Sequence, residues 1–522
     1  MKDFFTRFQA NRYTRDRDFR LIICVLAGLL IAMLPVLTIA MYAHPFADDF
    51  SYGNRTVGAW RETGSLLAAA KAAAEGVGEV FQTWQGTFAG VFVMAMHPAV
   101  FSESLYGPGL IGVMLAFVTG IFAVLKVGLM DCLRAEKWEY IVIASVMVFL
   151  AIEFVPFPQE AFYWYNSAVY YTGFASLSLF LAALLLKAAN AEKLSWRTAL
   201  LCGGGGMISF VIGGGNFPNA LTAALMTALF AAYALIKRRK TFWVPLISLA
   251  CLCAALFISV SAPGNAIRQE ALINENLYPM SGLSAILTSF VYAAMFVPLV
   301  AGAPEFLAFA ALTPLLYRLA ARSGFSFSLP GAVTVLLYGA YASSFTPNLY
   351  TMSGYGPMRV VDYNYYVFLF FVLVTVLYWC GWAARKSAER RAAMSRQRAR
   401  FAKRRQKIDV PVPNGQLAVR VISVTAAACF AIVLLVTASG NKDAITSVSA
   451  AHSLLNGEAE RYRAEHAARL ALFASGDKNL RLTPYTAMPH LIYFGDLSGD
   501  PADYRNSGEA QWYGLESVAL EK

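Results

Sequence analysis

The sequence predicts an all-α polytopic membrane protein with about eleven transmembrane helices and a small extracytoplasmic C-terminal domain. Of its 522 residues, 58% are hydrophobic and only 14% charged, whereas soluble proteins carry roughly a quarter charged residues. Uncharged apolar runs such as 21–42 fit helices of about 20 residues that cross a hydrocarbon core about 30 Å thick. Basic residues gather in short segments beside these runs, a pattern that marks the cytoplasmic side of a membrane.

The net charge of +11 comes mainly from one segment. Between Arg385 and Lys407 there are eleven Lys and Arg residues and a single acid, Glu389, and six more basic residues precede the first apolar run. Such segments orient the chain and attract anionic headgroups. We therefore expect the lipid bilayer as a partner and no nucleic acid.

The order of apolar and basic segments gives the topology. With residues 1–20 in the cytoplasm, the candidate spans are 21–43, 108–130, 139–155, 168–188, 198–213, 217–236, 241–262, 292–317, 328–345, 365–384 and 417–438. The basic loops and the arginine-rich run then lie inside. Segment 280–318 is long enough for two crossings, but two would export that run. We therefore predict one crossing, preceded by a segment at the interface or re-entering; thirteen spans are the alternative if two short helices pair.

This topology divides the chain into a transmembrane core, 21–384, an arginine-rich cytoplasmic linker, 385–416, a last helix, 417–438, and an extracytoplasmic tail, 439–522. The first apolar run is too long for a signal-peptide core, so we expect an uncleaved anchor. The first outer loop covers 44–107. In the tail, 444–472 predicts one amphipathic helix, and the remainder predicts irregular or strand-rich structure.

The seven cysteines lie in or beside apolar runs. The outer segments are therefore not joined by disulfides, and the cysteines show no spacing typical of a metal site.

The adjacent carboxylates of Asp48 and Asp49 follow the first span. Because two such groups repel, one is expected to be held by a cation, a hydrogen-bond donor or a proton. One carboxylate can accept the proton of an incoming hydroxyl, and the other can orient that acceptor or help to bind a divalent cation. The alternative is a helix N-cap, since Asp caps well and a helix can begin near Phe50.

A second candidate surface lies further along the same loop. Residues 66–80 predict an interfacial helix, and Trp84 and His97 follow it. Trp84 suits the headgroup level of a membrane, or else a wall of a substrate groove. His97 can contact a phosphate, although a single histidine before a proline is typical of a structural role.

The loop at 156–166 combines four aromatic residues with a carboxylate and an amide. Glu160, Tyr163 and Asn166 are candidate sugar-binding residues, because aromatic faces stack on pyranose rings and amides bind hydroxyls. An interfacial aromatic belt explains the aromatic residues equally well, but it explains Glu160 less well.

Two arginines lie in outer loops that contain Pro and Gly. Arg268 follows one span and Arg359 precedes another. Irregular backbone at membrane depth is tolerated where it lines a cavity, and an arginine there can bind a phosphate with two hydrogen bonds. The alternative for each is an interfacial arginine that extends to water.

Six motifs occur in order: Ala47-Asp48-Asp49-Phe50, Trp84-Gln85-Gly86-Thr87, 160–166, Ala262-Pro263-Gly264-Asn265, the Pro/Gly loop before Arg359, and 489–496. Together they resemble a largely uncharacterised bacterial family of GT-C-like membrane glycosyltransferases, which is similar to the O-antigen glucosyltransferases of serotype conversion. The resemblance covers most of the chain. The small tail departs from the family pattern, because many GT-C enzymes carry larger outer domains. A tail of this size makes recognition of a large protein acceptor less obvious.

The resemblance implies a GT-C fold, a catalytic acid at Asp48 or Asp49, and Arg359 or Arg268 against a lipid phosphate. It implies a polyprenyl-phosphate sugar as donor and a glycan, lipid or protein of the cell envelope as acceptor. The setting would be the bacterial cytoplasmic membrane, with the N-terminus inside and the C-terminus outside. A divalent cation, Mg²⁺ or Mn²⁺, at the two aspartates stays open. The alternatives are a transporter or flippase of a lipid-linked sugar and a non-catalytic assembly subunit.

Overall fold

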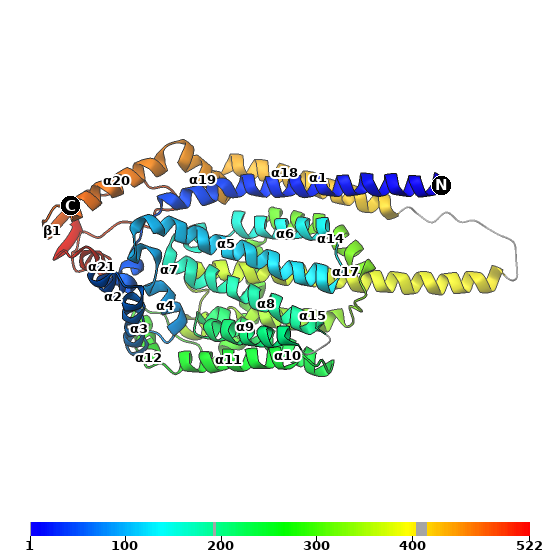
Figure 1. Cartoon of the computed structure of the whole chain (residues 1–522), viewed down its shortest axis with the longest axis horizontal. Helices are drawn as coiled ribbons and strands as arrows, with labels where there is room; N and C mark the ends of the chain where they lie inside the picture. The colour runs from blue at the N-terminus through cyan, green and yellow to red at the C-terminus, as the bar shows by residue number, and fades with distance from the viewer. Residues whose placement is uncertain (1, 192–194, 403–414, 522) are drawn as a thin grey trace.

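The computed structural model describes residues 2–191, 195–402 and 415–521. Long helices lie side by side along the molecule, and both chain ends are visible at opposite ends of Figure 1. These helices are α1 (Lys2–Ile39), α5 (Tyr106–Leu125), α6 (Lys137–Glu153), α8 (Phe174–Asn190), α9 (Trp196–Gly213), α10 (Phe217–Ile236), α11 (Trp243–Val260), α13 (Gly282–Val300), α14 (Ala303–Arg322), α15 (Pro330–Ser343), α17 (Met358–Ala402) and α18 (Gly415–Gly440).

Seven helices in the described residues are long and apolar enough to cross a membrane. They cover Asp18–Tyr42, Glu103–Cys132, Tyr165–Asn190, Phe217–Ile236, Trp243–Val260, Gly282–Val300 and Met358–Arg396. The all-α, multi-pass character predicted from composition is therefore confirmed. Two helices extend far beyond the predicted spans: α1 includes most of the basic N-terminal segment, and α17 continues into the arginine-rich segment to Ala402. Residues 403–414 of that segment lie outside the described residues.

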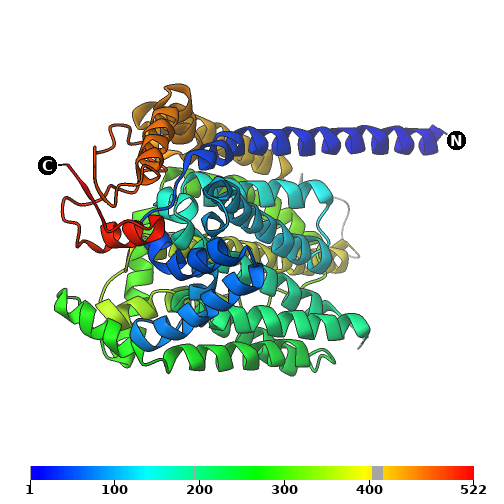
Figure 2. The ribbon, with the colours of Figure 1, turned by 60° about the vertical axis from the view of Figure 1, so that its left-hand side comes forward.

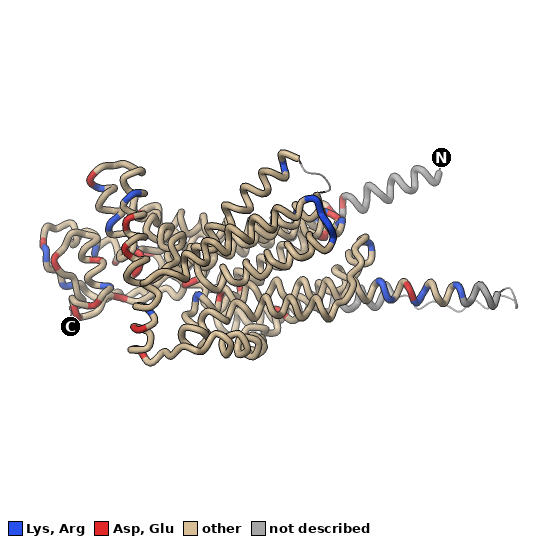
Figure 3. Tube along the Cα trace, turned by 90° about the horizontal axis from the view of Figure 1, so that it is seen from below, with Lys and Arg blue, Asp and Glu red and all other residues tan. Residues whose placement is uncertain are grey.

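One end of the bundle, which we call the capped end, carries short helices (Figure 1). They are α2 (Asp48–Thr63), α3 (Leu66–Thr83), α4 (Phe88–Ala95), α7 (Tyr165–Ala168), α12 (Gly264–Asn274) and α16 (Thr346–Met352). The predicted interfacial helix 66–80 is α3. At the opposite end, Lys and Arg line the part of α17 that projects from the bundle (Figure 3).

Segment 280–318 forms two helices, so the predicted span 292–317 is wrong in its bounds. Helix α13 stays near the capped end: Met280 N–H donates to the Tyr350 carbonyl, and further along the helix the Phe296 ring lies 5.3 Å from that of Phe345. Helix α14 instead ends at Arg322, which pairs with Glu136 next to the start of α6. Helix α14 therefore runs between the two ends of the bundle, whereas α13 is the member of this pair that is long and apolar enough to cross a membrane.

The tail packs on the capped end and is mixed in structure. It contains α19 (Thr446–Leu455), α20 (Glu458–Phe473), α21 (Tyr504–Tyr513) and a parallel pair, β1 (Asn479–Leu482) with β2 (Ser517–Leu520). The single predicted helix at 444–472 is wrong, because Gly457 at φ +73° divides it. Helix α21 lies beside α2 (Figure 2), where the Trp512 ring contacts Phe50 at 5.5 Å.

Candidate active site

Helix α2 places the two adjacent aspartates in its first turn. The N-cap position belongs to Ala47, and neither aspartate caps the helix by a side-chain hydrogen bond, so the N-cap interpretation is wrong. Carboxylates in a first turn are stabilised by the positive end of the helix dipole. Because successive side chains on a helix point about 100° apart, Asp48 and Asp49 face different surroundings.

Asp49 is completely buried, and both of its oxygens accept hydrogen bonds. One oxygen accepts from the Tyr106 hydroxyl at 2.7 Å and from Phe46 N–H at 3.1 Å, and the other accepts from Asn166 N–H at 3.1 Å. Burial raises the pKa of the Asp49 carboxyl to about 7, against the lowering effect of these donors. The side chain therefore joins α2 to α5 and to the start of α7.

Asp48 is partly exposed, and no hydrogen bond from the described residues occupies its carboxylate. Partial burial raises the pKa of its carboxyl, and the charges of Arg359 and Arg268 act in the opposite direction. The Glu160 carboxylate raises this pKa further. Asp48 is thus a carboxylate without a hydrogen bond in the described residues, and the charges of two arginines lower its pKa against the effect of burial. Such a group can accept a proton.

Arg359 begins α17 and is held from two sides. Its Nη1 lies 3.2 Å from Glu160 Oε2, which also accepts from the Arg359 backbone N–H at 3.2 Å. Its guanidinium lies 5.4 Å from the centre of the Trp164 ring. This pairing explains Glu160 where an aromatic belt did not: the carboxylate orients the arginine that faces Asp48.

Arg268 lies on α12 and is held by the loop after α3. Its Nη1 donates to Gln85 Oε1 at 2.5 Å, and its guanidinium lies 5.7 Å from the centre of the Trp84 ring. Two glycines allow the two loops to approach: a Cβ at Gly86 would collide with the Ser259 carbonyl, and one at Gly264 with the Trp84 backbone nitrogen. The motifs around Gly86 and Gly264 are therefore one interlocked unit.

Of the other candidates, Tyr163 does not join this group. Its buried hydroxyl donates to the Val36 carbonyl of α1 at 3.0 Å. His97 is also buried, stacked on Trp512 at 5.4 Å, and burial lowers its pKa to about 3. Asn166 supports Asp49 through its backbone, and its buried side-chain amide has no partner in the described residues.

Two residues at the site, Tyr52 and Tyr504, were missed by sequence reasoning. The Tyr52 hydroxyl accepts a hydrogen bond from Gln85 Nε2 at 3.2 Å. Burial and the charge of Asp48 raise the pKa of Tyr52, and the charges of Arg268 and Arg359 lower it. The charge of Asp48 also acts on Tyr504 of the tail. Tyr52 lies one helical turn after Asp48, so periodicity could have found it. Nothing in the sequence signals Tyr504.

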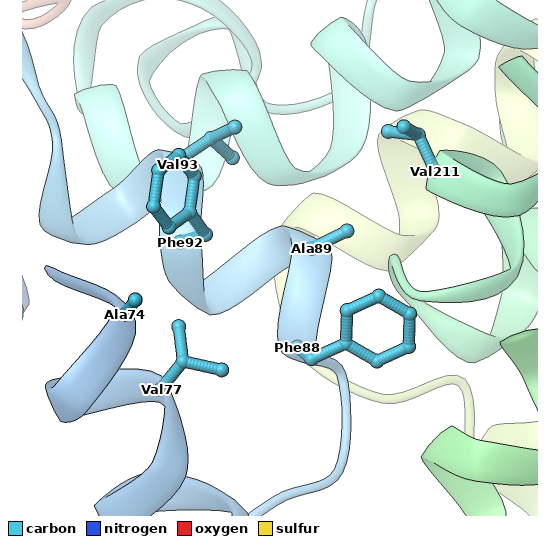
Figure 4. A pocket seen from close by; sticks show the side chains of 7 residues that line it. All are labelled: Ala74, Val77, Phe88, Ala89, Phe92, Val93 and Val211. Atoms are coloured by element: carbon cyan, nitrogen blue, oxygen red, sulfur yellow. The ribbon is translucent and has the colours of Figure 1, made fainter. Parts of the chain in front are cut away.

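The structure also has an open apolar cavity of about 290 Å³. Figure 4 shows its lining side chains, which come from α3, α4 and α9: Ala74, Val77, Phe88, Ala89, Phe92, Val93 and Val211. Phe88 follows Thr87, whose Oγ1 accepts from the Tyr170 hydroxyl at 2.9 Å. Phe88 also lies three residues after Gln85, which accepts a hydrogen bond from Arg268. The loop that holds Arg268 therefore leads directly into the cavity lining.

The helices and their composition define a multi-pass α-helical membrane protein with a charged site at one end of its bundle. Comparison with protein-family models, with curated proteins and with solved structures finds no match in any of the three.

Proposed function

We propose that the protein is a membrane glycosyltransferase that takes a sugar from a polyprenyl-phosphate donor and uses Asp48 as its base. The observation that carries the proposal is that the charges of Arg359 and Arg268, from two separate segments, act on the Asp48 carboxylate, while an open apolar cavity lies between α3, α4 and α9. A carboxylate, two cations and a hydrocarbon-lined space are the groups that a lipid-phosphate donor and a hydroxyl acceptor require.

In the proposed reaction, the acceptor hydroxyl gives its proton to the Asp48 carboxylate. The hydroxyl oxygen forms a bond to the anomeric carbon as the bond from that carbon to the phosphate oxygen breaks. The electron pair leaves with the lipid phosphate, so the anomeric configuration inverts. Arginines placed where charge develops stabilise such a departing group. The partly raised pKa of Asp48 matches the role of a base.

The positions of the other groups support distinct tasks. Arg359, fixed by Glu160 and Trp164, and Arg268, fixed by Gln85, would bind the donor phosphate with hydrogen bonds in a fixed geometry. The exposed ring of Trp84 would contact a sugar or the lipid. The cavity between α3, α4 and α9 would receive the first hydrocarbon units of the donor.

Asp49 is assigned a supporting role, because its two oxygens are already engaged by three donors. A cation shared between Asp48 and Asp49 would compete with these donors for the buried carboxylate of Asp49. We therefore propose catalysis by Asp48 without a metal bridge between the two aspartates.

The proposed orientation places the capped end outside the bacterial cytoplasmic membrane and the projecting basic part of α17 inside. Eleven crossings result when α13 stays at the capped end and α14 crosses alone. The mixed-charge tail would then be extracytoplasmic and would cover the site, where Tyr504 is available to an acceptor glycan, lipid or protein.

The test is transfer by purified protein in detergent, with a panel of polyprenyl-phosphate sugars and release of polyprenyl phosphate as the readout. Wild type should release it, and Asp48→Asn should reduce kcat by about 100-fold or more, the contribution typical of a general base. Asp477→Asn, a change at an exposed tail carboxylate, is the matched control. Release that is unaffected by Asp48→Asn would refute the assignment of the base. Absence of release with every donor, together with movement of a lipid-linked sugar across vesicles, would favour a flippase instead.

A further inference from the structure

A second cluster of titratable side chains lies away from Asp48, where the tail meets the bundle. His44 lies between α1 and α2, Glu103 precedes α5, and His466 lies on α20. His466 Nε2 is 2.6 Å from Glu103 Oε1, and His44 Nδ1 is 3.4 Å from the same oxygen. Within the described residues, this is the one group of three or more His, Cys, Asp and Glu side chains whose donor atoms converge.

The donor set and its spacing match a transition-metal site. Two imidazole nitrogens and one carboxylate oxygen form a set that zinc uses in proteins, with bonds of about 2.0–2.2 Å and a further position left to water. In a tetrahedral arrangement such donors are about 3.3 Å apart. The three donor atoms here lie within 4.8 Å of one another, so small side-chain rotations bring them to that spacing.

The surroundings also resemble those of a metal site. Ligating histidines are normally fixed by a hydrogen bond at the second ring nitrogen, and His466 Nδ1 lies 2.8 Å from the Tyr485 hydroxyl. The two imidazole rings stack at 3.7 Å between centres, and His466 is buried. The donor atoms therefore come from rigid, partly dehydrated side chains rather than from mobile surface groups.

We propose that His44, Glu103 and His466 bind one divalent transition-metal ion, with zinc as the expected occupant, and that this ion fastens the tail to the bundle. The three residues are separated by long stretches of sequence, so one ion would join three segments. Glu103 also lies 3.4 Å from the Tyr513 hydroxyl of α21, and α21 packs against α2. The ion would thus hold in place the tail helix that borders the aspartates. This inference does not depend on the proposed transfer reaction.

The test measures zinc bound by the full-length protein in detergent, after removal of metal with a chelator and dialysis against zinc. Wild type should bind about one zinc ion per chain with an affinity that magnesium does not match, because nitrogen ligands favour transition metals. Glu103→Gln and His466→Gln should abolish this binding. His452→Gln, which changes a partly exposed histidine of α19, should retain it.

A milder variant keeps the test valid if the ligand variants do not fold. Tyr485→Phe removes only the hydroxyl that orients His466, and it should weaken zinc binding about 10- to 100-fold. Zinc should also raise the melting temperature of wild type and of His452→Gln, but not that of Glu103→Gln. Wild type that binds no zinc, or zinc binding that is equal in wild type, Glu103→Gln and Tyr485→Phe, would overturn the proposal.

Discussion

Replacement of Asp49 tests whether the two adjacent aspartates have separate roles. In Asp49→Ala, the Tyr106 hydroxyl and the backbone N–H groups of Phe46 and Asn166 lose their shared acceptor inside the protein. A buried donor left without a partner costs about 1–3 kcal/mol. We use the lower end for each, because the raised pKa of Asp49 indicates that its carboxylate is itself poorly solvated. The sum is a loss of about 3 kcal/mol in the free energy of unfolding.

Two further variants give a graded series. In Asp49→Asn, the amide oxygen can still accept from Tyr106 and Phe46, but the amide NH₂ then faces Asn166 N–H, so one donor is lost, at about 1–3 kcal/mol. In Asp48→Asn no hydrogen bond within the described residues is lost, and the effect should stay within about 0.5 kcal/mol. Stability should therefore fall in the order Asp48→Asn, Asp49→Asn, Asp49→Ala.

The assay is thermal denaturation of the purified variants in one detergent, read from intrinsic fluorescence and from the folded fraction on size exclusion. Transfer activity, measured well below the denaturation temperature, is the second property compared among the variants. We expect Asp48→Asn to be stable and inactive, and Asp49→Asn to be unstable with partial activity. Equal stability of Asp49→Ala and Asp48→Asn would refute the structural role of Asp49. An unstable Asp48→Asn would refute the division between the two residues.

Three other predictions concern the surroundings of Asp48. A base works only when deprotonated, so activity should rise with pH through the raised pKa of Asp48. Because Arg359 lowers this pKa, Arg359→Gln should move the acidic limb of the pH–rate profile to higher pH. An acidic limb that does not move would contradict the arrangement. Glu160→Gln should move the limb to lower pH, because Glu160 raises the same pKa; a shift in the same direction as in Arg359→Gln would contradict it. Gly86→Ala should reduce kcat/KM about tenfold or more, because the new Cβ meets a backbone carbonyl of α11 and overpacking costs about 1–3 kcal/mol. The control is Gly78→Ala, whose Cβ meets nothing within 4 Å and whose kcat/KM should be close to that of wild type.

The predictable part of this protein follows from hydrophobicity and charge. Runs without charge locate the helices, because they respond to the bilayer rather than to tertiary contacts. The orientation expected from the basic segments stays a prediction. The bounds around 280–322 could not be predicted in this way. Whether an apolar helix crosses the bundle or lies at one end of it depends on the helices around it. The contact of Phe296 with Phe345 is a tertiary contact, which hydrophobicity alone does not predict. Likewise, Gly457 divides the predicted tail helix, although a single glycine costs a helix only about 1 kcal/mol.

The candidate site shows the same limit. Sequence alone selects Asp48, Asp49, Arg268 and Arg359 as residue types suited to phosphate and proton transfer, but it does not say which aspartate is free. That choice depends on how α2 is rotated. Phe50 anchors the helix against Trp512 of the tail, and this rotation turns Asp49 inward to Tyr106 and leaves Asp48 facing the arginines. If the base is selected by this packing, then the tail influences the chemistry of the site through the rotation of α2, in addition to any contact made by Tyr504. Loosening α21 should therefore lower activity even while Asp48 and both arginines are unchanged.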